Sequence, residues 1–305
     1  TLFIHFNSKN KKMQQNYQEF KQVREFGDLF SDTFAFISNH WKSFFGGFFK
    51  LAWPFILIAL IGNTYYQIEA TGNFFDEALM NTQNPFLPFT NLIPSFLFFG
   101  ISSFLLTVVS YAYVNLYIKA FMENKEEIDL QNIQNEMYNK LLSISGLQIL
   151  VFLSVFVGFM ICFLPGIYLL VPLSFALSVY LFESKSVTDA YAHTFQLIRD
   201  NWWITFAAIL VMSIIIAFAG GIFQLPAFLY TVINTATSVQ ETDPQQAINS
   251  MSTDYVIVAL NAIASFASYI FNLAFILMTV YIYFNLNERQ FGTGSFEQID
   301  EIGNE

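Results

Sequence analysis

Residues 141–182 read LLSISGLQILVFLSVFVGFMICFLPGIYLLVPLSFALSVYLF and contain no Asp, Glu, Lys or Arg. A helix needs about 20 apolar residues to cross the hydrocarbon core of a bilayer, so this stretch is long enough for two helices. Pro165-Gly166 interrupts the stretch, and such a dipeptide is typical of a turn. The stretch therefore predicts two antiparallel membrane-spanning helices, residues 141–163 and 166–182.

The composition of the whole chain also indicates a membrane protein. Only 12% of its 305 residues are charged, against about 25% in soluble proteins, and 55% are hydrophobic. A soluble globule of this composition would expose more apolar surface than soluble proteins tolerate. The counts of 14 Gly, 8 Pro and 1 Cys argue against collagen-like, disordered and disulfide-stapled classes, and the net charge of −10 argues against nucleic acid as a partner.

Further charge-free runs give the number of spans. They cover residues 51–68, 78–118, 201–240 and 255–287. Because the runs are continuously apolar, they argue against a β-barrel, whose strands alternate apolar and polar residues. We predict an all-α polytopic membrane protein with six transmembrane helices, at residues 45–66, 91–118, 141–163, 166–182, 203–224 and 255–286.

The positions of Lys and Arg predict the orientation. With these six spans, all 13 lie on one side of the membrane, whereas residues 67–90 and 225–254 carry carboxylates and no Lys or Arg. By the positive-inside rule, we expect both termini to be cytoplasmic.

The sequence contains an internal repeat. A shift of 161 positions aligns Asp28, Thr33, Phe34, Ile37, Trp41 and Phe45 with Asp189, Thr194, Phe195, Ile198, Trp202 and Phe206. A shift of 170 positions aligns Tyr111, Tyr113, Asn115, Leu116 and Phe121 with Tyr281, Tyr283, Asn285, Leu286 and Phe291, and sets Lys119 against Arg289. We infer three hairpin repeats at about residues 20–120, 121–183 and 184–290, between an N-terminal tail (residues 1–19) and a C-terminal tail (residues 291–305).

An amphipathic segment precedes each hairpin. In the first one, apolar residues recur at helical spacing from Phe26 to Trp41, with Asp28 and Asp32 on the opposite face. Similar patterns cover residues 130–141 and 189–202. We expect three elbow helices that lie in the membrane interface, with Trp41 and Trp202 at headgroup depth.

The stretch from Leu164 to Phe206 carries a family resemblance. Its recognisable parts are Pro165-Gly166-Ile167, Glu183, Ala190, Thr194-Phe195 and Trp202, in that order. They resemble the six-helix membrane domain of some bacterial glycerophosphodiester phosphodiesterases and related stand-alone inner-membrane proteins. The resemblance implies this fold and a bacterial cytoplasmic (inner) membrane location. It implies no active site, because catalysis in the fused members belongs to a separate soluble barrel.

The sequence offers few candidates for chemistry. It contains no P-loop, dinucleotide-binding fingerprint, HExxH, GxSxG or paired-Cys zinc pattern. We therefore expect no enzymatic activity, no cofactor and no metal site. The lone Cys162 is interpreted as a packing residue within the third span.

Seven residues remain as candidate contacts for lipid or a partner. Asp28 with Asp32 and Asp189 with His193 are i, i+4 pairs, which either meet a cation or headgroup or simply form the polar face of a helix. Lys50 is the only charge inside a predicted span, where it either reaches back to the interface or contacts a substrate or lipid phosphate. Trp41 and Trp202 complete the set.

Other polar residues predicted at membrane depth, Gln148, Asn261 and Asn272, favour interhelical hydrogen bonds over a transport path. The segment Phe296–Gly303 is expected to dock on the elbow helices or on a partner.

The preferred function is a non-enzymatic membrane scaffold or auxiliary subunit that organises lipid or a partner protein at the cytoplasmic face. Its partners would be membrane lipids together with another protein or a second copy of the chain, and not nucleic acid. One alternative is a small transporter or lipid-moving protein. Another is the separated membrane half of a lipid-degrading enzyme.

Overall fold

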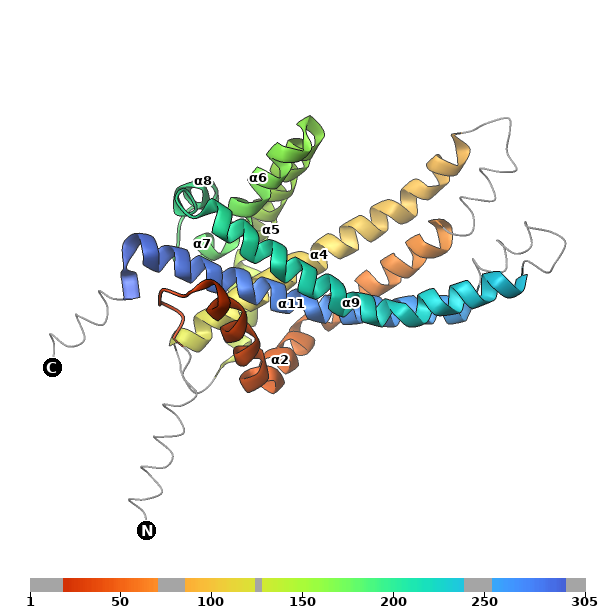
Figure 1. Cartoon of the computed structure of the whole chain (residues 1–305), viewed down its shortest axis with the longest axis horizontal. Coiled ribbons are helices and arrows are strands. Elements are labelled where there is room, and N and C mark those ends of the chain that lie inside the picture. Colours follow the sequence, from red (N-terminus) through yellow and green to blue (C-terminus); the bar gives the residue numbers. More distant parts are fainter. Residues whose placement is uncertain (1–18, 71–85, 124–127, 239–253, 295–305) are drawn as a thin grey trace, which may run out of the picture. The chain divides into compact units, whose positions relative to one another are not determined.

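The computed structural model describes residues 19–70, 86–123, 128–238 and 254–294, and every regular element within these ranges is helical (Figure 1). In chain order the helices are α2 (Phe26–Ile68), α4 (Leu87–Glu123), α5 (Leu130–Ile161), α6 (Phe163–Leu173), α7 (Ala176–Phe182), α8 (Val187–Leu197), α9 (Trp202–Ser238) and α11 (Tyr255–Phe291).

Six helical segments in the described ranges are long and apolar enough to cross a membrane. They are Phe26–Ile68, Phe89–Glu123, Leu130–Ile161, Phe163–Phe182, Trp202–Asn234 and Tyr255–Phe291. Each contains most or all of one of the six predicted spans, and several extend well beyond it. Large apolar side chains such as Phe152, Phe156 and Met160 of α5 are exposed, as expected of a helix that faces lipid. These segments indicate a multi-pass membrane protein.

The turn between the third and fourth spans lies a few residues before the predicted position. α5 ends at Ile161, and Cys162 is extended, with φ −169° and ψ 155°. Pro165 lies in the first turn of α6, where its missing N–H costs no helical hydrogen bond. Cys162 is therefore an exposed residue of the turn and does not pack within a span as predicted. The fourth span also differs, because it consists of two helices, α6 and α7, separated at Ser174 and Phe175.

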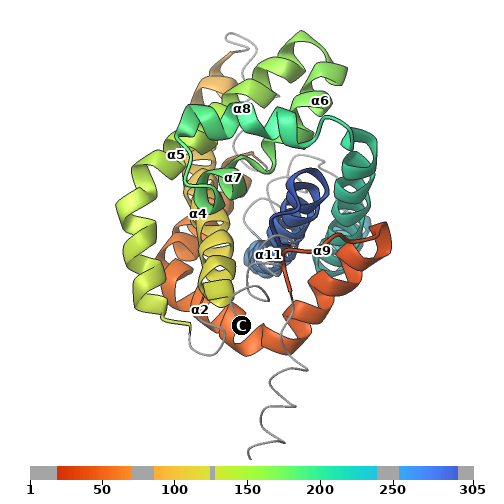
Figure 2. The same cartoon turned by 90° about the vertical axis from the view of Figure 1, so that its left-hand side faces the viewer.

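The first two amphipathic segments are not separate elbow helices. α2 is a single helix of 43 residues that continues from Phe26 through the first span, and α5 likewise continues from Leu130. The third segment contains a separate helix, α8, which packs against α5, α6 and α7 (Figure 2). Ser186 caps α8 by accepting the N–H of Asp189 at 3.2 Å.

The helix that contains the fifth predicted span, residues 203–224, extends further along the chain than that span. α9 continues through Pro226 to Ser238. Transmembrane helices tolerate proline because the freed backbone groups find other partners.

The described chain divides into two compact units. Within the described ranges, unit 1 comprises residues 19–50, 111–213 and 274–294, and unit 2 comprises residues 51–110 and 214–273. The long helices α2, α4, α9 and α11 each contribute residues to both units.

An aromatic core forms the centre of unit 1. The Tyr113 hydroxyl of α4 donates to the Phe44 carbonyl of α2 at 2.6 Å, and the Tyr113 ring also packs on Phe48. Gly47 permits this approach, because a Cβ there would lie only 2.5 Å from the Tyr113 hydroxyl oxygen and 2.7 Å from Leu130 Cδ2. Gly47 therefore leaves room against α2 for the Tyr113 hydroxyl and the Leu130 side chain.

Polar pairs join the helices of unit 2. Asn63 of α2 donates to Ser265 Oγ of α11 at 2.7 Å, and Gln224 of α9 donates to Asn261 Oδ1 of α11 at the same distance. The prediction that Asn261 forms an interhelical hydrogen bond is thus confirmed.

Asp254 lies just before α11. It accepts one hydrogen bond from the Tyr230 hydroxyl at 2.8 Å and another from the Val256 N–H, and these two bonds lower the pKa of its carboxyl group.

Candidate functional site

Residues 19–25 form a non-helical segment before α2, called the strap below. Phe20 anchors it: the ring is 1% exposed and stacks on Tyr281 of α11, with centroids 4.8 Å apart. Phe20 also meets Phe36 of α2 and Phe121 of α4 edge-on. Burial of one Phe side chain contributes roughly 1.5–3 kcal/mol, so this ring is a substantial part of what holds the strap.

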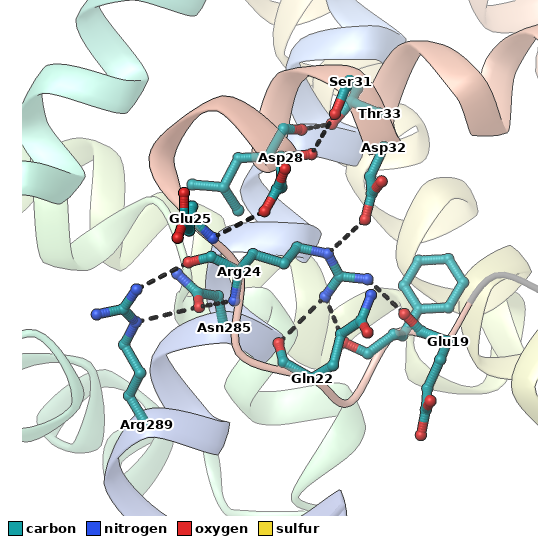
Figure 3. Close-up of polar contacts among 12 residues, drawn as sticks. Glu19, Gln22, Arg24, Glu25, Asp28, Ser31, Asp32, Thr33, Asn285 and Arg289 are labelled. Carbon is teal, nitrogen blue, oxygen red and sulfur yellow. Dashed lines mark hydrogen bonds and ion pairs between the residues drawn. The ribbon is translucent and has the colours of Figure 1, made fainter.

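Arg24 of the strap is 2% exposed and fully occupied by partners (Figure 3). Its Nε donates to Asp32 Oδ2 at 2.8 Å, and Nη1 and Nη2 donate to the carbonyls of Phe20 and Glu19. Its Cζ lies 4.7 Å from the centroid of the Tyr281 ring. A buried cation is tolerated only when it is paired and hydrogen-bonded in this way, so Arg24 fixes the strap in one position.

Asn285 of α11 binds the backbone of the strap. Its Oδ1 accepts the backbone N–H of Arg24 at 2.8 Å and Nε of Arg289 at 3.2 Å (Figure 3). Arg289 also donates from Nη2 to the Arg24 carbonyl at 2.8 Å. Arg289 is exposed, and it makes no ion pair with any carboxylate in the described ranges. Within the described ranges, no carboxylate therefore compensates its charge at the end of α11.

A small cavity lies beside this cluster, between residues of the strap, α2, α9 and α11. Its volume is about 20 Å³, which is room for one water-sized group. It is lined by Arg24, Phe26, Leu29, Asn201, Ile204, Thr205, Ala208, Ile282, Asn285, Leu286 and Arg289.

A second polar cluster surrounds Glu183 at the end of α7. Its carboxylate accepts the Tyr283 hydroxyl at 3.0 Å and lies 2.6 Å from Lys185 Nζ and 3.3 Å from His193 Nε2. The His193 ring also stacks on Phe291 of α11. This cluster ties α8 to α7 and α11.

The two predicted i, i+4 pairs do not act as units. Asp32 is bound to Arg24, whereas Asp28 accepts the Glu25 N–H at 3.2 Å at the start of α2. Asp189 accepts the Ser186 hydroxyl at 2.6 Å, while His193 faces Glu183. In the ranges that the structure describes, no group of three or more His, Cys, Asp or Glu side chains is arranged to hold a metal ion.

The remaining candidates lie on the outside of unit 1. Trp41 is exposed beside Lys42, whose Nζ lies 5.6 Å from the Trp41 ring centroid. Trp202 is half-buried and stacks on Tyr168 and Phe206. Lys50 is exposed and has no ion-pair or hydrogen-bond partner among the described residues.

Asp32 thus belongs to the polar cluster around Arg24, and His193 belongs to the cluster around Glu183. Lys50, Trp41 and Trp202 belong to neither cluster. The residues that sequence reasoning missed as site residues are Arg24, Thr205 and Glu183, together with Asn285 and Arg289. The repeat alignment includes the last two, which is the signal that could have found them. The segment Phe296–Gly303 lies outside the described residues.

Comparison with known proteins gives the site no further identity. No protein-family model, no curated protein and no solved structure matches this chain.

Proposed function

We propose that this protein is a non-enzymatic membrane scaffold or auxiliary subunit that organises lipid or a partner protein at the cytoplasmic face. One observation carries the proposal: three groups of charged side chains in unit 1 are held in ion pairs with one another. Arg24 is paired with Asp32, Glu136 lies 2.8 Å from both Lys119 and Lys140, and Glu183 contacts Lys185 and His193. A nucleophile or general base needs a reactive atom free to face a substrate. Groups engaged in this way instead hold a surface in shape.

The placement in the membrane belongs to the same proposal. Six apolar helices, with the Lys and Arg residues sorted to one side, support cytoplasmic termini in a bacterial inner membrane. They also agree with the six-helix membrane domain that the sequence resembles. On this proposal the amphipathic segments, including the first part of α2, lie at the interface with Trp41 at headgroup depth.

Pairs of aligned residues support the proposed repeat. Thr33 and Thr194 are both fully buried, and each hydroxyl donates to a carbonyl one turn earlier in its own helix. Asn115 and Asn285 are both buried, and each Oδ1 accepts a hydrogen bond from a distant segment, Ser178 for the first and Arg24 for the second. Similar roles at aligned positions are expected of duplicated hairpins.

The alternatives have less support. A transporter would use polar groups at membrane depth, but Asn63 and Asn261 of unit 2 are engaged in interhelical pairs, which leaves Lys50 as the charged candidate. The separated half of a lipid-degrading enzyme would need a hydrolase on another chain.

Phe34 provides the test. It is 44% exposed on the amphipathic part of α2, so Phe34→Glu adds a charge to an apolar surface without cutting into the core. The wild-type chain, purified in mild detergent from native membranes, should retain a protein or lipid in stoichiometric amount. We expect the Phe34→Glu variant, purified in the same way, to retain at most about one tenth as much per chain. Asn39→Glu, which adds the same charge at an exposed polar position of the same helix, is the control and should retain it.

Two results would contradict the proposal. One is equal retention of the same protein and lipid by the wild-type chain and the Phe34→Glu variant. The other is hydrolysis of glycerophosphodiesters by the purified chain.

A further inference from the structure

Two buried side chains on the wall of the cavity have donors without acceptors. Thr205 is 2% exposed, and its hydroxyl hydrogen-bonds to no described residue. Asn285 is 7% exposed, and its Oδ1 accepts two hydrogen bonds, while its amide nitrogen donates none to any residue in the described ranges. Neither donor atom is fully occluded, and both residues line the cavity. A buried donor without an acceptor raises the free energy of the folded protein. We therefore expect an acceptor for these two donors inside the cavity.

The charge around the cavity selects an anion. Among the described residues that line the cavity none is Asp or Glu, and the cations there are Arg24 and Arg289. The charge of Arg24 is compensated by Asp32, so the positive potential comes from Arg289, whose Nη1 hydrogens have no acceptor in the described structure. Asn201 and Thr205 also place the N-terminus of α9, a long helix, at the cavity, where the helix dipole favours a negative group.

The size and the rim of the cavity define the anion further. A volume of about 20 Å³ admits one oxygen atom and no carbon chain. Phe26 and Ile204, which also line the cavity, are exposed apolar side chains. This arrangement fits a ligand that places one charged oxygen inside the cavity. The ligand would have further oxygens within reach of a guanidinium and an apolar body outside the cavity.

We propose that this cavity is a phosphate-binding site for an anionic phospholipid. One non-bridging phosphate oxygen enters and accepts hydrogen bonds from Asn285 Nδ2 and the Thr205 hydroxyl. Arg289 binds the remaining oxygens at the mouth, and the acyl chains lie against Phe26 and Ile204. This assignment rests on the proposed function and names the lipid chemistry that the scaffold would recognise.

Native mass spectrometry of the full chain in detergent tests the site, with phosphatidylglycerol, diacylglycerol and inorganic phosphate as separate probes. We expect one phosphatidylglycerol to bind per chain and diacylglycerol, which lacks the phosphate, not to bind. Thr205→Val removes one donor without changing the shape of the side chain and should weaken binding about tenfold, and Arg289→Gln should weaken it at least as much. Arg199→Gln, an exposed cation that does not line the cavity, and Thr107→Val, an exposed hydroxyl on α4, should not change it.

The inorganic phosphate arm identifies the source of the phosphate. If phosphate alone binds and competes with the lipid, the cavity recognises the headgroup alone. If it does not compete, the acyl chains contribute as well, and both results support a phosphate site. Two results would overturn the assignment of a phosphate site. One is equal binding of phosphatidylglycerol and diacylglycerol, and the other is unchanged binding in Thr205→Val and Arg289→Gln. Either result would mean that the cavity holds only a water molecule. That failure is distinct from failure of the scaffold, which the Phe34→Glu comparison tests separately.

Discussion

Replacing Arg24 with alanine is expected to lower the free energy of unfolding by about 3–5 kcal/mol and to release the strap. The substitution removes the guanidinium that pairs with Asp32 and that donates to the carbonyls of Phe20 and Glu19. It also removes the cation from the face of Tyr281. Thermal unfolding in detergent, together with limited trypsin cleavage at Lys21, measures both effects.

Arg199→Ala is the matched control, since Arg199 is exposed and forms no ion pair in the part of the chain that the structure describes. We expect its unfolding temperature and its cleavage pattern to equal those of the wild type. If Arg24→Ala behaves like this control, the strap is not held by the buried guanidinium, and the account of the cluster is wrong.

Replacing Gly47 with leucine is expected to destabilise unit 1 by about 3 kcal/mol. The new Cβ alone would collide with the Tyr113 hydroxyl and with Leu130. Because the Tyr113 side chain is buried, relief of that contact displaces its hydroxyl and breaks the hydrogen bond to the Phe44 carbonyl. Denaturant-induced unfolding in micelles, followed by tryptophan fluorescence, measures the change.

The neighbouring Gly46 offers a close control. A Cβ built there meets nothing within 4 Å, so Gly46→Leu changes the same residue type in the same helix without a collision. Its effect should stay within about 1 kcal/mol, because leucine also has the higher helix propensity. Equal destabilisation by the two substitutions would show that close packing at Gly47 does not matter.

The sequence predicts the six apolar helices well because their signal is local. Except for Lys50 in the first span, the predicted spans contain no charged residue, and this pattern alone locates α2, α4, α5, α9 and α11. Helix ends are predicted less well, because a proline has opposite meanings in different contexts. Pro165 begins α6 after the turn, whereas Pro226 lies inside α9, and only the surrounding packing distinguishes the two cases.

The polar clusters could not be predicted because their partners lie far apart in the chain. Arg24 looks like a residue on the polar face of an amphipathic helix, yet it is buried against Asn285, 261 positions away. Asp32 was predicted as half of a pair with Asp28, but its partner is Arg24 in the strap. The repeat alignment did mark Asn285 and Arg289, although it gave no reason to assign them to a site.

Topology mapping tests the central claim most directly, namely that lipid surrounds a chain that crosses it an even number of times. Cys162 is exposed, so it is first replaced by alanine, and single cysteines are then placed at the exposed positions Phe86, before α4, and Arg199, after α8. A membrane-impermeant maleimide added to intact, right-side-out cells or spheroplasts should label the cysteine at position 86 directly and the cysteine at position 199 only after permeabilisation. Labelling of both positions from the same side of a sealed membrane would contradict the account.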